Sequence, residues 1–143
     1  MEPLHYLLMK AHTQVNRQIM TEAAALGLSP GQPKVLECLL ACGECNQKTI
    51  AGYCEIEQAT VGSILLRMER DGLVCRTQKD GNRRSLYVLL TEHGRQVAVQ
   101  VQQIFQRADA RAQAGLTREE CLYLQQLLQK VYDAAAEPER KSF

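Results

Sequence analysis

The sequence has no apolar run approaching the roughly 18 residues that a membrane-spanning helix needs. Its longest apolar stretches, Cys38 to Cys42 and Leu86 to Leu90, are short. The N-terminal segment MEPLHYLLMK also lacks a basic stretch ahead of an apolar one, which argues against a secretory signal. We therefore expect a cytoplasmic protein that has no contact with a membrane.

The sequence also lacks an excess of charge of either sign. Its 17 Lys and Arg residues and 16 Asp and Glu residues give a net charge of +1, which by itself argues neither for nor against nucleic acid. However, residues 67–84 hold six basic and three acidic side chains, so this segment carries +3. A local basic patch on a near-neutral protein is what a DNA-facing surface requires, although a solvated charged face would have the same composition.

Motifs of common catalytic sites are missing as well. The sequence contains no HExxH, no glycine-rich phosphate loop and no GxSxG nucleophile elbow, and its three histidines are dispersed. We expect neither an enzyme nor a bound cofactor. The 143 residues, 45% hydrophobic and 23% charged, are instead typical of one ordinary globular domain.

Most of the chain has helical periodicity. Apolar residues recur at steps of three and four over residues 4–25, which predicts an amphipathic helix. Ser29 is expected to cap a second helix, with Pro30 in its first turn and Gln32 reaching back to complete a capping box. Gly43 is expected to end that helix.

Two short helices are predicted close together in the middle of the chain. One begins after Asn46 and continues to about Cys54, and the other extends from about Gln58 to Asp71. The turn at 55–57 that joins them has the length found in a helix-turn-helix, whose second helix enters the major groove of DNA.

After this second helix, the spacing of the apolar residues changes from the steps of three and four of a helix to the alternation of a strand. Residues 74–78 and 84–90 are predicted strands, and the Asp-Gly pair within the turn at 79–82 is a strong hairpin signal. A β-hairpin directly after a helix-turn-helix is a wing, and this one has a basic tip.

Two long helices are expected after the hairpin, capped by Thr91 and by a Thr117–Glu120 capping box. Together with the helix at 4–25 they carry more apolar surface than the compact centre needs. We expect a second copy of the chain to cover this surface, since helix-turn-helix proteins usually dimerise to match two half-sites. Packing of these helices on their own centre is the alternative.

Four segments of the sequence resemble the MarR family of bacterial winged-helix regulators. They are LSPGQ at 28–32, QKTIA at 47–51, ATV at 59–61 with its continuation to Val74, and NRR at 82–84 with its continuation to Gly94. Each motif is weak alone, but their order and spacing together are specific. The resemblance implies a mainly α fold with a small β-hairpin wing. It places a winged helix-turn-helix domain at 28–94 of a single chain 1–143, flanked by dimerisation helices at 1–27 and 95–143.

The function that the resemblance implies is sequence-specific regulation of transcription. We expect a homodimeric repressor on a pseudo-palindromic double-stranded DNA operator, relieved by a small-molecule effector or an oxidant. The effector would bind in a cleft between the winged-helix and dimerisation regions. The competing interpretation is a winged-helix module that mediates only protein–protein contacts.

Helix-turn-helix docking geometry identifies candidate DNA contacts in three places. Bases would be read at the start of the second helix, and Arg67, one turn further on, would reach a guanine or a phosphate. The start of the first helix would lie near the DNA backbone, and the wing tip would contact phosphate or the minor groove. The expected residues are Gln58, Thr60, Ser63 and Arg67; Gln47, Lys48 and Thr49; and Lys79, Arg83 and Arg84. An ordinary solvated helix face is the alternative. The family usually has aspartate where this chain has Asn82, so its wing arginines should be tethered less firmly.

Six cysteines are expected to be thiols in a reducing cytoplasm. Four of them, Cys38, Cys42, Cys45 and Cys54, fall in one short stretch and have three interpretations. They are small buried hydrophobic residues, a thiol switch, or metal ligands, for which CGEC at 42–45 would be half a zinc knuckle. Relatives that sense peroxides often use a cysteine in the first helix, where this chain has none.

Overall fold

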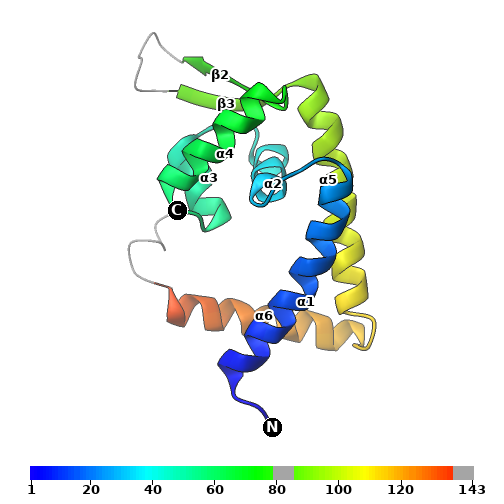
Figure 1. Cartoon of the computed structure of the whole chain (residues 1–143). Helices are drawn as coiled ribbons and strands as arrows, with labels where there is room; N and C mark the ends of the chain where they lie inside the picture. Colours follow the sequence, from blue (N-terminus) through cyan, green and yellow to red (C-terminus); the bar gives the residue numbers. More distant parts are fainter. Residues whose placement is uncertain (79–85, 137–143) are drawn as a thin grey trace.

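The computed structural model describes residues 1–78 and 86–136, and this part of the chain is mainly helical, as predicted (Figure 1). The elements in chain order are α1 (Leu4–Ala25), α2 (Gln32–Cys42), β1 (Cys45–Asn46), α3 (Gln47–Cys54), α4 (Gln58–Arg70), β2 (Val74–Gln78), β3 (Leu86–Leu90), α5 (Glu92–Ala112) and α6 (Arg118–Ala135). Within the described residues, no helix is both long and apolar enough to cross a membrane.

Three predicted helix caps are confirmed. The side chain of Asn46 accepts a hydrogen bond from the backbone N–H of Thr49 at 2.8 Å, and that of Thr91 accepts one from Gly94 at 2.9 Å. Thr117 and Glu120 form both bonds of a capping box at the start of α6. Each side chain satisfies a backbone donor that the first turn of a helix leaves free.

The predicted start of α2 is wrong. Ser29 and Pro30 precede the helix, which begins at Gln32, and Pro33 rather than Pro30 lies in its first turn. The Gln32 side chain does accept from the Ser29 N–H at 3.0 Å, as expected. The helix starts late because Gly31 has a left-handed φ of 89° and passes so close to α4 that a Cβ there would lie 2.6 Å from Ile64 Cδ1.

The two predicted strands of the wing pair with each other and with a third strand that was not predicted. The sheet is antiparallel in the order β1-β3-β2, with Cys45 opposite Val88 and Val74 opposite Leu90. The two residues of β1 are too few to show an alternating pattern. β1 fixes the start of α3 against the base of the wing.

The core of the helix-turn-helix is formed by side chains from every element around it. Those with almost no exposed surface include Leu36, Ile50, Leu65, Met68 and Val88. α5 packs on α2 and on α1, so it connects this core to the N-terminal helix.

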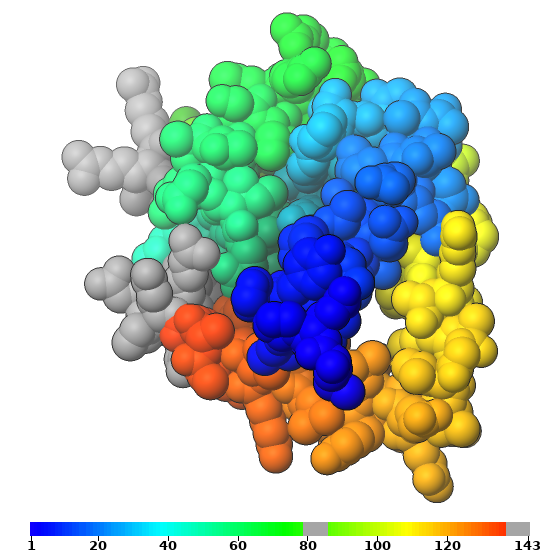
Figure 2. Space-filling model, turned by 60° about the horizontal axis from the view of Figure 1, so that its bottom comes forward, coloured from blue at the N-terminus to red at the C-terminus, as the bar shows by residue number. Residues whose placement is uncertain are grey.

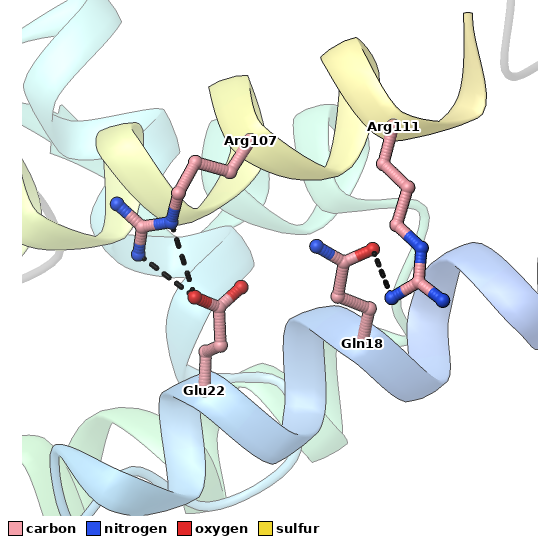
Figure 3. A network of polar contacts seen from close by, with 4 residues as sticks. All are labelled: Gln18, Glu22, Arg107 and Arg111. Carbon is pink, nitrogen blue, oxygen red and sulfur yellow. Dashed lines mark hydrogen bonds and ion pairs between the residues drawn. The ribbon is translucent and has the colours of Figure 1, made fainter. Parts of the chain in front are cut away.

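Polar contacts accompany the packing of α1 on α5 (Figure 3). Arg107 of α5 forms an ion pair with Glu22 of α1 at 2.9 Å, and one turn further on Arg111 donates to Gln18 at 3.5 Å. A small apolar cluster that includes Ile19 and Ile104 lies between the same helices. These contacts fix the direction of α1 relative to α5.

Candidate nucleic-acid interface

The helix-turn-helix is formed by α3, the turn at 55–57 and α4. Glu55 ends α3 with a left-handed φ of 55°, which redirects the chain into α4. α4 packs inward with Val61, Leu65 and Met68, all buried. Its opposite face is therefore directed to solvent and available to a ligand as large as a DNA duplex.

The predicted DNA contacts of α4 all lie on that outward side of the helix. Gln58, Thr60, Ser63 and Arg67 are exposed. The Ser63 hydroxyl donates to the backbone oxygen of Ala59 within the helix, at 3.4 Å. Amide, hydroxyl and guanidinium groups on one exposed helix face offer the donors and acceptors that base edges and phosphates require.

Gln47, predicted to lie near the DNA backbone, also connects the two helices. It is half-buried, and its Nε2 donates to the backbone oxygen of Gln58 at 2.9 Å. A Cβ at Gly62 would lie 3.1 Å from the same nitrogen, so the glycine leaves space for this side chain. Gln47 therefore sets the position of the N-terminal end of α4, a role that its place in the sequence does not reveal. Lys48 and Thr49, in contrast, are exposed at the start of α3.

A groove of about 400 Å³ lies between the starts of α3 and α4 and the base of the wing. Arg76 of β2 and Tyr87 of β3 contribute to its lining and were not among the predicted contact residues. Arg76 Nε lies 2.5 Å from Glu69 Oε1 as an ion pair, without hydrogen-bond geometry, and this pair connects α4 to the wing. The predicted wing residues Lys79, Asn82, Arg83 and Arg84 lie outside the described residues.

The four clustered cysteines lie behind this surface, where α2, β1 and α3 meet. Cys38, Cys45 and Cys54 are buried, and Cys42 is exposed. Burial and the neighbouring Cys38 raise the pKa of the Cys45 thiol to about 12. The Cys54 pKa is lowered, first by a hydrogen bond from the Cys38 thiol, despite its burial, and Lys34 contributes in the same direction. Among the described residues, no group of three or more His, Cys, Asp or Glu side chains is arranged to hold a metal ion.

Comparison with known proteins supports this geometry. Residues 28–86 match the model of the MarR family. An HTH-type transcriptional repressor of Mycobacterium tuberculosis is 26% identical over 90% of this chain and 93% of its own length.

Solved structures are similar over nearly the whole chain. A MarR-family transcriptional regulator from Silicibacter pomeroyi has a TM-score of 0.81 and 28% identity, over 92% of this chain and 88% of its own. BpsR of Bordetella bronchiseptica, whose DNA binding is regulated by 6-hydroxynicotinic acid, has the same fold, with a TM-score of 0.82 and 24% identity over 91% and 98% of the two chains.

Proposed function

The chain belongs to the MarR family of DNA-binding transcription regulators, and we propose that it acts as a homodimeric repressor that reads its operator with α4. In this proposal residues 28–94 form the DNA-binding region, and residues 1–27 and 95–143 form the dimer. The protein acts in the cytoplasm and catalyses no reaction.

The exposed polar face of α4 is the observation that carries the proposal. Gln58, Thr60 and Ser63 occupy the N-terminal part of the helix, where helix-turn-helix proteins contact base edges. Arg67 lies one turn further along and reaches a guanine or a phosphate. Lys48 and Thr49 at the start of α3, with the wing residues Lys79, Arg83 and Arg84, contact the backbone on either side.

The dimer is proposed from the apolar surface of the terminal helices. A groove of about 860 Å³ between α1 and α6 is lined largely by leucines. In Figure 2 these two helices, blue and orange, border an opening beside α5. Within the described part of the chain, α6 buries none of its residues, and its Leu122 and Leu124 are 53% and 43% exposed. An apolar face of this size requires a partner, and a second copy also supplies the second α4 that a pseudo-palindromic operator requires.

The proposal that the protein represses transcription, and that an effector relieves this repression, is based on what is known of its relatives. The Mycobacterium tuberculosis relative is a repressor, and DNA binding by the Bordetella protein responds to a hydroxylated aromatic acid. We include a small organic effector in the proposal on this basis.

A salt-dependent gel shift tests the proposed DNA binding. The probe is duplex DNA from upstream of the protein's own coding sequence. We expect binding that weakens steeply as salt increases, because Lys and Arg side chains displace counterions from phosphates. Ser63→Glu places a carboxylate against the DNA and should abolish the shift, whereas Gln126→Glu adds the same charge on α6 and should not. Equal binding by both variants, or no shift at low salt, would contradict the proposal and favour a protein-binding module.

A further inference from the structure

Leu66 is an exposed apolar side chain on α4, the helix proposed to read DNA. It is 64% exposed, more than any other leucine in the described part of the chain. A single exposed leucine on a protein surface is ordinary. Leu66 differs from such a residue because the surface that carries it is the one proposed to meet a ligand.

Most of the other exposed leucines belong to the terminal helices α1 and α6. Several of them, including Leu124 and Leu128, line the α1–α6 groove that the proposed dimer covers. Leu66 is not one of the residues that line this groove, and α4 packs on α3 and β2 instead. Burial of the groove by a second copy therefore does not account for Leu66.

Leu66 lies on the outward face of α4, among the residues proposed to contact bases. Ala59, Ser63 and Leu66 are all exposed and follow one another at steps of four and three, so they share one face of the helix. The buried Val61 and Met68 are directed to the opposite side, into the core. A duplex that contacts Ser63 therefore also meets Leu66.

The major groove offers an apolar side chain one apolar group on the edges of the bases. This group is the 5-methyl of thymine, since the other groups on these edges are hydrogen-bond donors and acceptors. Contact between a leucine and this methyl removes both from water, which corresponds to about fourfold in affinity for one methyl group. Contact with a polar edge would instead leave a donor or acceptor unpaired, which weakens binding.

We propose that Leu66 reads the 5-methyl group of a thymine in each half-site of the operator. This inference rests on the proposed DNA binding by α4, and it adds a residue that determines specificity. Ser63 and Arg67, on either side of Leu66, offer polar groups to neighbouring positions. Leu66 makes a thymine at its own position the preferred base.

The test removes only the methyl groups from the DNA. The probe is the duplex from upstream of the protein's own coding sequence, prepared once with thymidine and once with deoxyuridine in its place. Both duplexes have the same phosphates and the same hydrogen-bonding groups on their bases. We expect the unmodified homodimer to bind the uracil duplex about 15-fold more weakly, from about fourfold at each of two half-sites.

Two substitutions of Leu66 assign this difference to its side chain. Leu66→Ala should bind both duplexes alike, because it no longer reaches the methyl group. Leu66→Met keeps an apolar side chain of similar length and should retain most of the difference. The exposed position of Leu66 lets both variants fold, which thermal melting verifies.

Leu26→Ala is the matched control. It removes the same atoms from a leucine that is 38% exposed and lies outside α4. This variant should keep the affinity ratio between the two duplexes, whatever its absolute affinity.

The outcomes separate this inference from the proposed function. If the unmodified protein binds both duplexes alike, or if Leu66→Ala keeps the ratio of the unmodified protein, the inference is wrong and the proposed DNA binding stands. If Leu66→Ala binds the thymine duplex as tightly as the unmodified protein, Leu66 does not contact DNA, and a protein partner becomes the better explanation of its exposure. If the unmodified protein binds neither duplex at low salt, the proposed function fails and this inference fails with it.

Discussion

The Tyr132 hydroxyl of α6 donates a hydrogen bond of 2.6 Å to the Glu55 carboxylate in the turn of the helix-turn-helix. The two residues are 77 positions apart, and they connect the proposed dimerisation helix to the turn that positions α4. A change in α6, whether from dimerisation or from an effector, therefore has a direct route to α4, the helix proposed to read DNA.

Tyr132→Phe should weaken DNA binding about threefold without disrupting the fold. The variant keeps the ring and removes only the hydroxyl, and the loss of one exposed hydrogen bond costs about 1 kcal/mol or less. Affinity is measured by titration and the dimer by sedimentation. Tyr123→Phe removes a hydroxyl from a tyrosine of α6 that is 62% exposed and serves as the control. Equal affinities of the two variants would show that the contact does not connect α6 to α4.

Gly94→Ala should destabilise the fold by about 3 kcal/mol, as expected for an atom forced into a packed site. A Cβ at Gly94 would lie 1.8 Å from the backbone oxygen of Leu73, where no side-chain rotation relieves the clash. Gly115→Ala is the control, because a Cβ there meets nothing within 4 Å. Denaturant unfolding measures both, and similar unfolding midpoints would contradict the close approach of α5 to the end of α4.

Leu124→Glu or Leu128→Glu should weaken dimerisation and DNA binding together. Both leucines line the α1–α6 groove, and a carboxylate there would have to be desolvated when a second copy binds. Sedimentation at micromolar concentration measures the change, with Gln126→Glu as a variant of equal charge. Unmodified protein that sediments as a monomer would refute the dimer.

Glu37→Gln should change how stability depends on pH. Burial, and then the negative charge of Asp109, raise the pKa of the Glu37 carboxyl above its usual 4.5. The unfolded chain therefore loses this proton first, so the group's contribution to stability is present below pH 4.5 and is lost as pH rises through the folded-state pKa. Glu37→Gln should abolish this loss, and Asp109→Asn should reduce it. Thermal melting of the unmodified protein and the variants between about pH 4 and pH 7 tests this prediction. A Glu37→Gln variant whose stability depends on pH in the same way as that of the unmodified protein would contradict it.

Much of the fold could be predicted from the sequence because local side chains determine it. Asn46, Thr91 and Thr117 cap the helices that they were predicted to cap. The spacing of apolar residues along the sequence also predicts the positions of α4 and of the wing strands. The start of α2 could not be predicted, because the close approach of Gly31 to Ile64 is a tertiary contact. β1 was missed because its pairing with β3 depends on residues more than 40 positions away.

The candidate site was predicted in outline but not in its internal contacts. The exposed positions of Gln58, Thr60, Ser63 and Arg67 follow from helical periodicity. The bond from Gln47 to the Gln58 backbone and the Arg76–Glu69 pair depend on how α3, α4 and the wing meet in space. The grouping of Cys38, Cys42, Cys45 and Cys54 could be predicted from their spacing, but which of them are buried depends on how α2, β1 and α3 pack.

The most direct test of the proposed function is titration of Thr60→Ala and Lys48→Ala against operator and scrambled duplexes at several salt concentrations. If α4 reads bases, Thr60→Ala should lose about 1–3 kcal/mol on the operator and much less on scrambled DNA. If α3 contacts phosphate, Lys48→Ala should weaken binding to both duplexes alike and reduce the salt slope by about one unit. Loss of affinity by Thr60→Ala that is equal on both duplexes would contradict the assignment of α4 as the reading helix.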